Sequence, residues 1–193
     1  MSKPKMVVAT GNANKLREFS QLFIDYEVVS QKEMGFLEEV EETGVTFAEN
    51  ALIKARAAAK ALGVPALADD SGLCVTALGG APGVYSARYS GDHNDKSNRE
   101  KLLEELGDSV DRTAYFQCAI ALVYPNGKEL IAEGRTYGNI LFEERGEGGF
   151  GYDSLFESVD LKKSFGEATA EEKNAVSHRN RALKALLEKL DEQ

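Results

Sequence analysis

Segments with the periodicity of a β-strand alternate with segments with the periodicity of a helix, and this alternation constrains the fold more than any other feature of the sequence. Met6 to Ala9 is typical of a short buried strand. Apolar residues then recur at helical spacing over residues 14–23, after the turn Gly11-Asn12-Ala13. The chain therefore opens with a βα unit, which favours an α/β fold.

The same patterns predict the remaining elements. A capping box formed by Thr46 and Glu49 opens a helix that ends near Leu62. The turn Pro125-Asn126-Gly127 joins two strands into an antiparallel hairpin, so the sheet is expected to be mixed. Strands are predicted at residues 6–9, 27–30, 66–68, 112–124, 128–137 and 155–156, and helices at residues 14–23, 46–62, 95–106 and around 183–190.

Length and charge restrict the organisation and the partners. The 193 residues fit one domain, and we expect residues 1–193 to form it. The net charge of −9 disfavours nucleic acid as a partner. Cys74 and Cys118 match neither zinc spacing nor a disulfide framework and are expected to be buried thiols. No segment resembles a signal peptide or a membrane span, so we expect a cytoplasmic protein without a membrane partner.

The turn after the first strand is a candidate phosphate site. In Thr10-Gly11-Asn12-Ala13-Asn14-Lys15, backbone N–H groups at a helix start lie beside a lysine. The sequence does not match the longer glycine loop of a Walker motif. An ordinary βα turn, with Asn14 capping the helix, explains this segment equally well.

Acidic residues are concentrated at two places. Glu38, Glu39, Glu41 and Glu42 precede the capped helix, and Asp69-Asp70 end a predicted strand. Such oxygen ligands suit Mg²⁺. The alternative for the glutamates is a solvated loop, and for the aspartates a turn. Since adjacent strand residues point to opposite faces, we expect one aspartate to face the site and the other to fix local backbone.

Two further segments could bind a planar base. Phe150 lies among four glycines and could stack on a base, although the loop alone favours a core role for its ring. Lys173 and Ser177-His178-Arg179 offer several donors, which suit a purine O6/N7 edge or a phosphate. The alternative for Arg179 is a surface ion pair.

Taken together, these segments resemble the inosine triphosphatase family, the noncanonical purine nucleoside triphosphate pyrophosphatases. The resemblance covers nearly the whole chain, and the motifs occur in order. They are residues 9–12 with Lys15, residues 41–47 leading to residues 49–51, residues 68–73, residues 79–83, residues 86–89, residues 149–153, and Lys173 with residues 177–179.

The resemblance implies specific roles. The triphosphate would be held by Thr10, Gly11, Asn12, Ala13, Asn14, Lys15 and Lys54. Mg²⁺ would be held by Glu41 and Asp70, with Asp70 also as proton acceptor and Ser71 as a substrate contact. The purine pocket would comprise Phe150, Gly151, Tyr152, Asp153, Lys173, His178 and Arg179.

It also implies a fold and an activity. The expected fold is an elongated single α/β domain with a long central mixed sheet, helices on both sides, and an active-site cleft between two lobes. The expected protein is a homodimer that hydrolyses ITP, dITP and XTP to the monophosphate and diphosphate with Mg²⁺. Two alternatives stay open: a pyrophosphatase for pyrimidine or modified nucleotides, and a nucleotide-binding module without catalysis.

Two positions depart from the family pattern. Ser154 stands where many relatives have proline, and Gly166 stands where alanine is frequent. Each replaces a stiffer residue with a more flexible one, so we expect a less rigid pocket loop.

Overall fold

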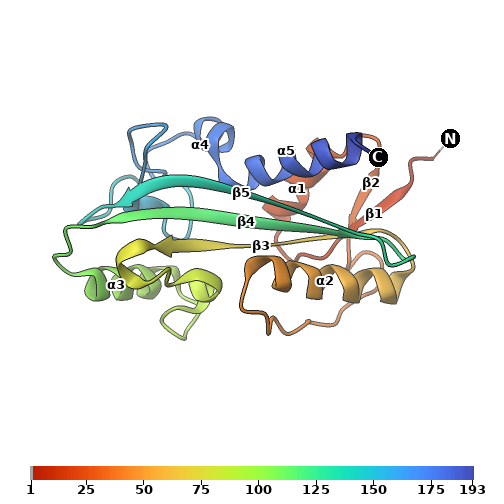
Figure 1. Cartoon of the computed structure of the whole chain (residues 1–193), viewed down its shortest axis with the longest axis horizontal. Helices are drawn as coiled ribbons and strands as arrows, with labels where there is room; N and C mark the ends of the chain where they lie inside the picture. Colours follow the sequence, from red (N-terminus) through yellow and green to blue (C-terminus); the bar gives the residue numbers. More distant parts are fainter. Residues whose placement is uncertain (1) are drawn as a thin grey trace. The chain divides into compact units, whose positions relative to one another are not determined.

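The computed structural model describes residues 2–193, except for the side chain of Asn14 (Figure 1). The chain divides into two compact units. Unit 1 comprises the residues up to Asp70 together with Ala119–Glu133 and Leu183–Gln193. Unit 2 comprises Ser71–Cys118 and Gly134–Ala182.

Six strands form one mixed sheet, in the order β2-β1-β3-β4-β5-β6. Strand β1, next to the edge strand β2, is parallel to β2 and β3, whereas β5 and β6 are antiparallel. The expectation of an α/β fold with a mixed sheet is therefore confirmed. The strands are β1 (Lys5–Val8), β2 (Glu27–Ser30), β3 (Ala66–Val75), β4 (Thr113–Val123), β5 (Glu129–Ile140) and β6 (Phe156–Ser158).

In residues 2–193, five α-helices accompany the sheet: α1 (Ala13–Leu22), α2 (Phe47–Leu62), α3 (Asp95–Leu106), α4 (Ala170–Val176) and α5 (His178–Asp191). Short 3₁₀ helices occupy Thr76–Leu78, Gly83–Arg88 and Asp153–Leu155. The predicted N-cap of α2 is present, since Thr46 Oγ1 accepts from the Glu49 N–H at 3.1 Å. The Glu49 carboxylate closes the cap on the Val45 N–H at 2.8 Å, one residue before the position a capping box predicts.

In unit 1, α2 packs on the sheet through alanines. Ala51, Ala55, Ala58 and Ala59 are buried in one cluster with residues of β1 and β3, because small side chains let the helix approach the strands closely. Helix α1 lies on the opposite side of these two strands and buries Phe19 (Figure 1). This arrangement places the ends of α1 and α2 beside the same strands.

In unit 2, aromatic rings form the centre of the core. The ring of Phe156 lies 4.6 Å from that of Phe116 and 5.1 Å from that of Phe165, centroid to centroid. Leu102 of α3 and Leu155 belong to the same buried cluster. This core therefore joins α3, β4 and the segment that follows residues 149–153.

The structure corrects two predictions. Strand β3 continues to Val75, so Asp69 and Asp70 lie within the strand and not at its end. Strand β1 pairs with β3 only as far as Val8 with Leu67, so the two carboxylates lie just beyond the end of β1. Helix α4 was not predicted, although its capping box of Thr169 and Glu172 is visible in the sequence.

Two other expectations can be compared directly. Cys74 and Cys118 are buried free thiols, as predicted. Within residues 2–193, no helix combines the length and the apolar character needed to cross a membrane.

Candidate functional site

A cavity of about 400 Å³ in unit 1, called here the lysine cavity, collects most of the predicted phosphate-binding residues. It is lined by Ala9, Thr10, Gly11, Asn12, Lys15, Gln31, Glu38, Glu39, Val40, Glu42 and Lys54. Ala13 is exposed and starts α1. The side chain of Asn14 lies outside the described residues, so the prediction for it stays a prediction.

The turn after β1 is held by local hydrogen bonds. The Asn12 N–H donates to Thr10 Oγ1 at 3.1 Å, and Asn12 Oδ1 accepts from the Lys15 N–H at 3.4 Å. Asn12, which precedes α1, therefore takes the capping position that the sequence suggested for Asn14. A Cβ built on Gly11 would meet no protein atom within 4 Å, so the space beside this glycine is open.

Two lysines from different helices meet carboxylates at this cavity. Lys15 Nζ lies 2.9 Å from Asp69 Oδ2, and the Asp69 side chain is only 1% exposed. Lys54 Nζ lies 2.9 Å from Glu42 Oε1 and donates to the Asp69 carbonyl at 2.6 Å. Burial alone would lower the pKa of Lys54, but the negative charges of Asp69 and Glu42 outweigh it and raise that pKa. Lys54 is therefore cationic at neutral pH.

Asp70 is a buried carboxyl group with an unusual titration. Its Oδ2 accepts from Asn50 Nδ2 at 3.0 Å, and the residue is 9% exposed. Burial raises the pKa of Asp70 to about 6, and the charge of Glu42 adds to this effect while Lys54 and Asn50 oppose it. A carboxyl group with this pKa changes protonation close to physiological pH.

The two aspartates point to different helices, as their adjacent positions in β3 require. Asp70 reaches α2 through Asn50, whereas Asp69 reaches α1 through Lys15 across 54 sequence positions. We did not predict this long-range ion pair of Asp69. We also did not predict Asn50 as a site residue. Its Oδ1 accepts from the Gly44 N–H, so Asn50 connects the acidic segment to Asp70.

Of the two adjacent glutamates Glu41 and Glu42, the second lines the lysine cavity. Glu41, expected to hold a metal, is exposed and does not appear among the cavity-lining residues of the described chain. Glu42 lines the cavity and pairs with Lys54. In the part of the chain that the structure describes, no group of three or more His, Cys, Asp or Glu residues could hold a metal ion.

The residues predicted to bind a base lie in unit 2. Phe150 is 56% exposed, so the interpretation of its ring as a core residue is wrong. Asp153 Oδ2 accepts from the Phe150 N–H at 3.0 Å and from Lys173 Nζ at 2.6 Å. Lys173 Nζ also lies 4.6 Å from the centre of the Phe150 ring, a cation–π contact.

Backbone conformation fixes part of this loop. Gly149 has a φ of +72°, and a Cβ there would lie 2.2 Å from Asp153 Oδ2. Only glycine fits this position, because the loop closes tightly on the Asp153 carboxylate. The conformation of residues 149–153 therefore depends on the Asp153 carboxylate, which belongs to the same loop.

Tyr152, His178 and Arg179 are buried. The Tyr152 hydroxyl donates to the Ser86 carbonyl at 2.6 Å, and burial raises the pKa of Tyr152. His178 begins α5, and its ring stacks on Phe116 with 5.1 Å between centroids. Arg179 is 8% exposed, which does not fit the alternative of a surface ion pair. Ser71 is half-buried in β3.

The two departures from the family pattern are both held by contacts. The Ser154 hydroxyl donates to Glu144 Oε1 at 2.7 Å. A Cβ at Gly166 would lie 2.5 Å from the Arg145 carbonyl, so the backbone approaches too closely for alanine here. The expected flexibility of the loop stays a prediction. In the structure, Ser154 forms a hydrogen bond and Gly166 lies close to the backbone of Arg145.

Strand β1 of the mixed sheet ends in an open glycine turn beside lysines and carboxylates, and this arrangement defines a protein with a polar cavity suited to an anion or a metal–anion complex. The family model described as Ham1 family matches residues 6–189, and the chain belongs to this family.

Individual relatives extend over the whole chain. It is 47% identical to a protein named dITP/XTP pyrophosphatase from Lactiplantibacillus plantarum, over 100% of this chain and 98% of the relative. The solved Ham1 protein of Staphylococcus aureus has a TM-score of 0.93 at 43% identity, covering 97% of this chain and 98% of that one. A structure named nucleoside-triphosphatase / dITP/XTP pyrophosphatase, from Mycobacterium abscessus, has a TM-score of 0.83 at 47% identity, covering 95% and 98%.

Proposed function

We propose that this protein hydrolyses dITP, ITP and XTP to the nucleoside monophosphate and diphosphate. The names of the relatives from L. plantarum and M. abscessus support this activity, since each aligns over nearly its full length at 47% identity. The observation that carries the proposal is the lysine cavity, which Lys15 and Lys54 line, together with the buried Asp70, whose pKa is raised to about 6 and is influenced by the charge of Lys54.

The lysine cavity would bind the triphosphate. Gly11 does not have a left-handed backbone conformation, and a Cβ at this position would not clash with the protein. The open space beside it therefore suits a ligand that approaches the backbone. Lys15 and Lys54 would offset the charge that builds on the departing diphosphate. Their present carboxylate partners keep both ammonium groups at the cavity.

The oxygen donors of this cavity fit Mg²⁺, which usually takes one or two carboxylates and completes its octahedron with water and phosphate oxygens. Asp70 would be one ligand. For the second, the contacts favour Glu42, whose charge reaches Asp70, over the predicted Glu41. When bound, Mg²⁺ would neutralise charge on the phosphate oxygens.

Asp70 would also orient and deprotonate the attacking water. The water oxygen bonds to the α-phosphorus, the bond from that phosphorus to the bridging oxygen breaks, and diphosphate leaves. The water proton goes to the Asp70 carboxylate. Asn50 fixes this carboxyl group from α2, so its direction does not depend on substrate.

The buried donors of unit 2 would select the base. His178 and Arg179 can donate to the O6 keto group of hypoxanthine or xanthine, whereas adenine presents an amino group at this position. A site built around such a hydrogen bond can reject the wrong base by about 10⁴-fold. Phe150, exposed beside Lys173, would stack on the base.

We further propose that the protein acts in the cytoplasm as a homodimer. The homodimer rests on the family resemblance, whereas the cytoplasmic location rests on the sequence-based expectation for a chain without a segment that resembles a signal peptide or a membrane span.

Diphosphate release tests the proposed function. The protein is incubated with Mg²⁺ and, separately, with dITP, XTP, dATP and dCTP, and diphosphate and orthophosphate are quantified. Diphosphate from dITP and XTP supports the proposal. Diphosphate mainly from dCTP would favour a pyrimidine pyrophosphatase, and tight binding without products would favour a nucleotide-binding module.

A further inference from the structure

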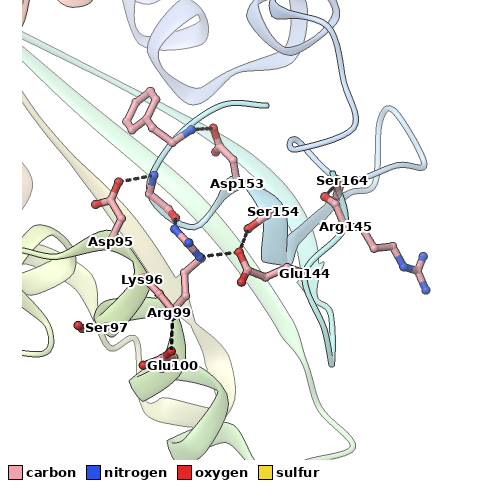
Figure 2. A network of polar contacts seen from close by, with 12 residues as sticks. Asp95, Lys96, Ser97, Arg99, Glu100, Glu144, Arg145, Asp153, Ser154 and Ser164 are labelled. Carbon is pink, nitrogen blue, oxygen red and sulfur yellow. Dashed lines mark hydrogen bonds and ion pairs between the residues drawn. The ribbon is translucent and has the colours of Figure 1, made fainter. Parts of the chain in front are cut away.

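Helix α3 forms two hydrogen bonds with the backbone of the loop that carries Phe150 (Figure 2). The Gly151 N–H donates to Asp95 Oδ2 at 3.0 Å, and the Gly151 carbonyl accepts from Arg99 Nη1 at 2.9 Å. Asp95 and Arg99 are four residues apart in α3, so they lie on one face of the helix. One helix face therefore satisfies both polar backbone groups of a single loop residue.

Two further contacts, both made by Glu144, support these hydrogen bonds. Arg99 Nε lies 2.7 Å from Glu144 Oε1 and forms an ion pair with this carboxylate. The same carboxylate oxygen accepts from the Ser154 hydroxyl at 2.7 Å. Arg99 is thus connected to the loop at Gly151 and, through Glu144, at Ser154 (Figure 2).

Phe150 is not part of a buried core cluster. The residue is 56% exposed, and its ring lies 4.6 Å from Lys173 Nζ. Its position follows from the backbone on its two sides, where Asp153 binds the Phe150 N–H and α3 binds the next residue.

We propose that Asp95 and Arg99 are positioning residues for base recognition, acting through Gly151 on Phe150. The proposal rests on the proposed function, in which Phe150 stacks on the base. Neither residue touches the lysine cavity, whose lining contains no residue of α3. Removing the hydrogen bonds of Asp95 or Arg99 to Gly151 should weaken base binding and leave the phosphate chemistry intact.

This role makes a prediction that a general loss of stability would not. An interaction that binds ground state and transition state equally affects KM and leaves kcat unchanged. Losing one such hydrogen bond changes affinity by about tenfold. The dITP over dATP preference, which the proposed function assigns to His178 and Arg179, should change little, because a stacked ring meets both purines alike.

The experiment compares Arg99→Met and Asp95→Ala with Asp95→Asn, whose amide oxygen can still accept from Gly151. Glu100→Gln is the matched control on the same helix, since Glu100 is exposed and pairs only weakly with Lys96 at 3.8 Å. For each variant we would measure kcat and KM with dITP and dATP, and the Kd for dIMP by calorimetry.

We expect Arg99→Met and Asp95→Ala to raise the dITP KM and the dIMP Kd about tenfold, with kcat within about threefold. Asp95→Asn and Glu100→Gln should match the wild type. Unchanged KM and Kd in Asp95→Ala would overturn the inference, as would equal losses in Asp95→Asn.

If Arg99→Met does not fold, Arg99→Lys replaces it. Its ammonium can reach only one of the two partners, so an intermediate rise in the dIMP Kd is expected and no rise would count against the role. A wild type that releases no diphosphate from dITP refutes the proposed function separately, because dIMP binding is measured without turnover.

Discussion

At the scale of single residues, Asp70 combines a proposed catalytic role with a cost to stability. Its pKa is raised from 3.8 to about 6, so the folded protein holds this proton more tightly than the unfolded chain. Well below pH 4 the group is protonated in both states and the cost is absent. The cost grows as pH rises to about 6 and is fully present above it, at about 1.4 kcal/mol per pKa unit.

Asp70→Asn should therefore stabilise the metal-free protein while removing activity. We expect a gain of about 1–3 kcal/mol at pH 8 that shrinks towards zero near pH 4. Turnover of dITP should fall more than about 10²-fold. Urea unfolding with EDTA across this pH range measures the change in stability. A variant less stable than the wild type at pH 8 would show that burial of the ionised Asp70 does not destabilise the protein.

The ion pair of Lys15 and Asp69 gives a second prediction. Lys15→Met leaves a carboxylate that is 1% exposed without this cation, and we expect a loss of about 1–3 kcal/mol at pH 7. Asp69→Asn in the same chain should recover part of the loss, because the uncompensated charge is gone. Urea unfolding of the two single variants and the double variant measures the coupling; additive losses would mean that the pair contributes nothing.

At the scale of elements, the start of α2 links helix stability to the site. Thr46→Ala removes the acceptor of the Glu49 N–H and should cost about 1 kcal/mol of unfolding free energy. Thr46→Ser, which keeps the hydroxyl, should cost much less. Denaturant midpoints measure both, and equal losses in the two variants would contradict the capping role.

Local patterns predicted most elements, because periodicity and caps act over a few residues. The segment 95–106 was predicted to the residue as α3, and 27–30 as β2. The end of β3 was misplaced because two aspartates and a glycine indicate a turn, whereas pairing within the sheet carries the strand on to Val75. Helix α4 was missed because none of its seven residues is fully buried, so the segment shows no apolar period.

The candidate site was predictable only in part, for a related reason. Lys15, Lys54 and Asp70 could be named from motifs, and the structure brings them together around one cavity and its neighbouring strand. The choice between Glu41 and Glu42 depends on which way an irregular segment turns, and no periodicity encodes that direction. The contact of Arg99 with Glu144 joins positions 45 apart, which the spacing of residues cannot reveal.

At the scale of the whole molecule, β3, β4 and β5 each contribute residues to both units. Shared strands should couple the two cores during unfolding. Phe156→Ala, which empties a fully buried position in unit 2, should cost about 3–5 kcal/mol and still give one transition. Calorimetry measures this, and two separated transitions would show that the units unfold independently.

The proposed function as a whole is tested most directly by hydrolysis of dITP in ¹⁸O-labelled water, with mass analysis of both products. The account predicts one labelled oxygen in dIMP and none in diphosphate, because the water attacks the α-phosphorus. Label in the diphosphate, or release of orthophosphate in place of diphosphate, would contradict it.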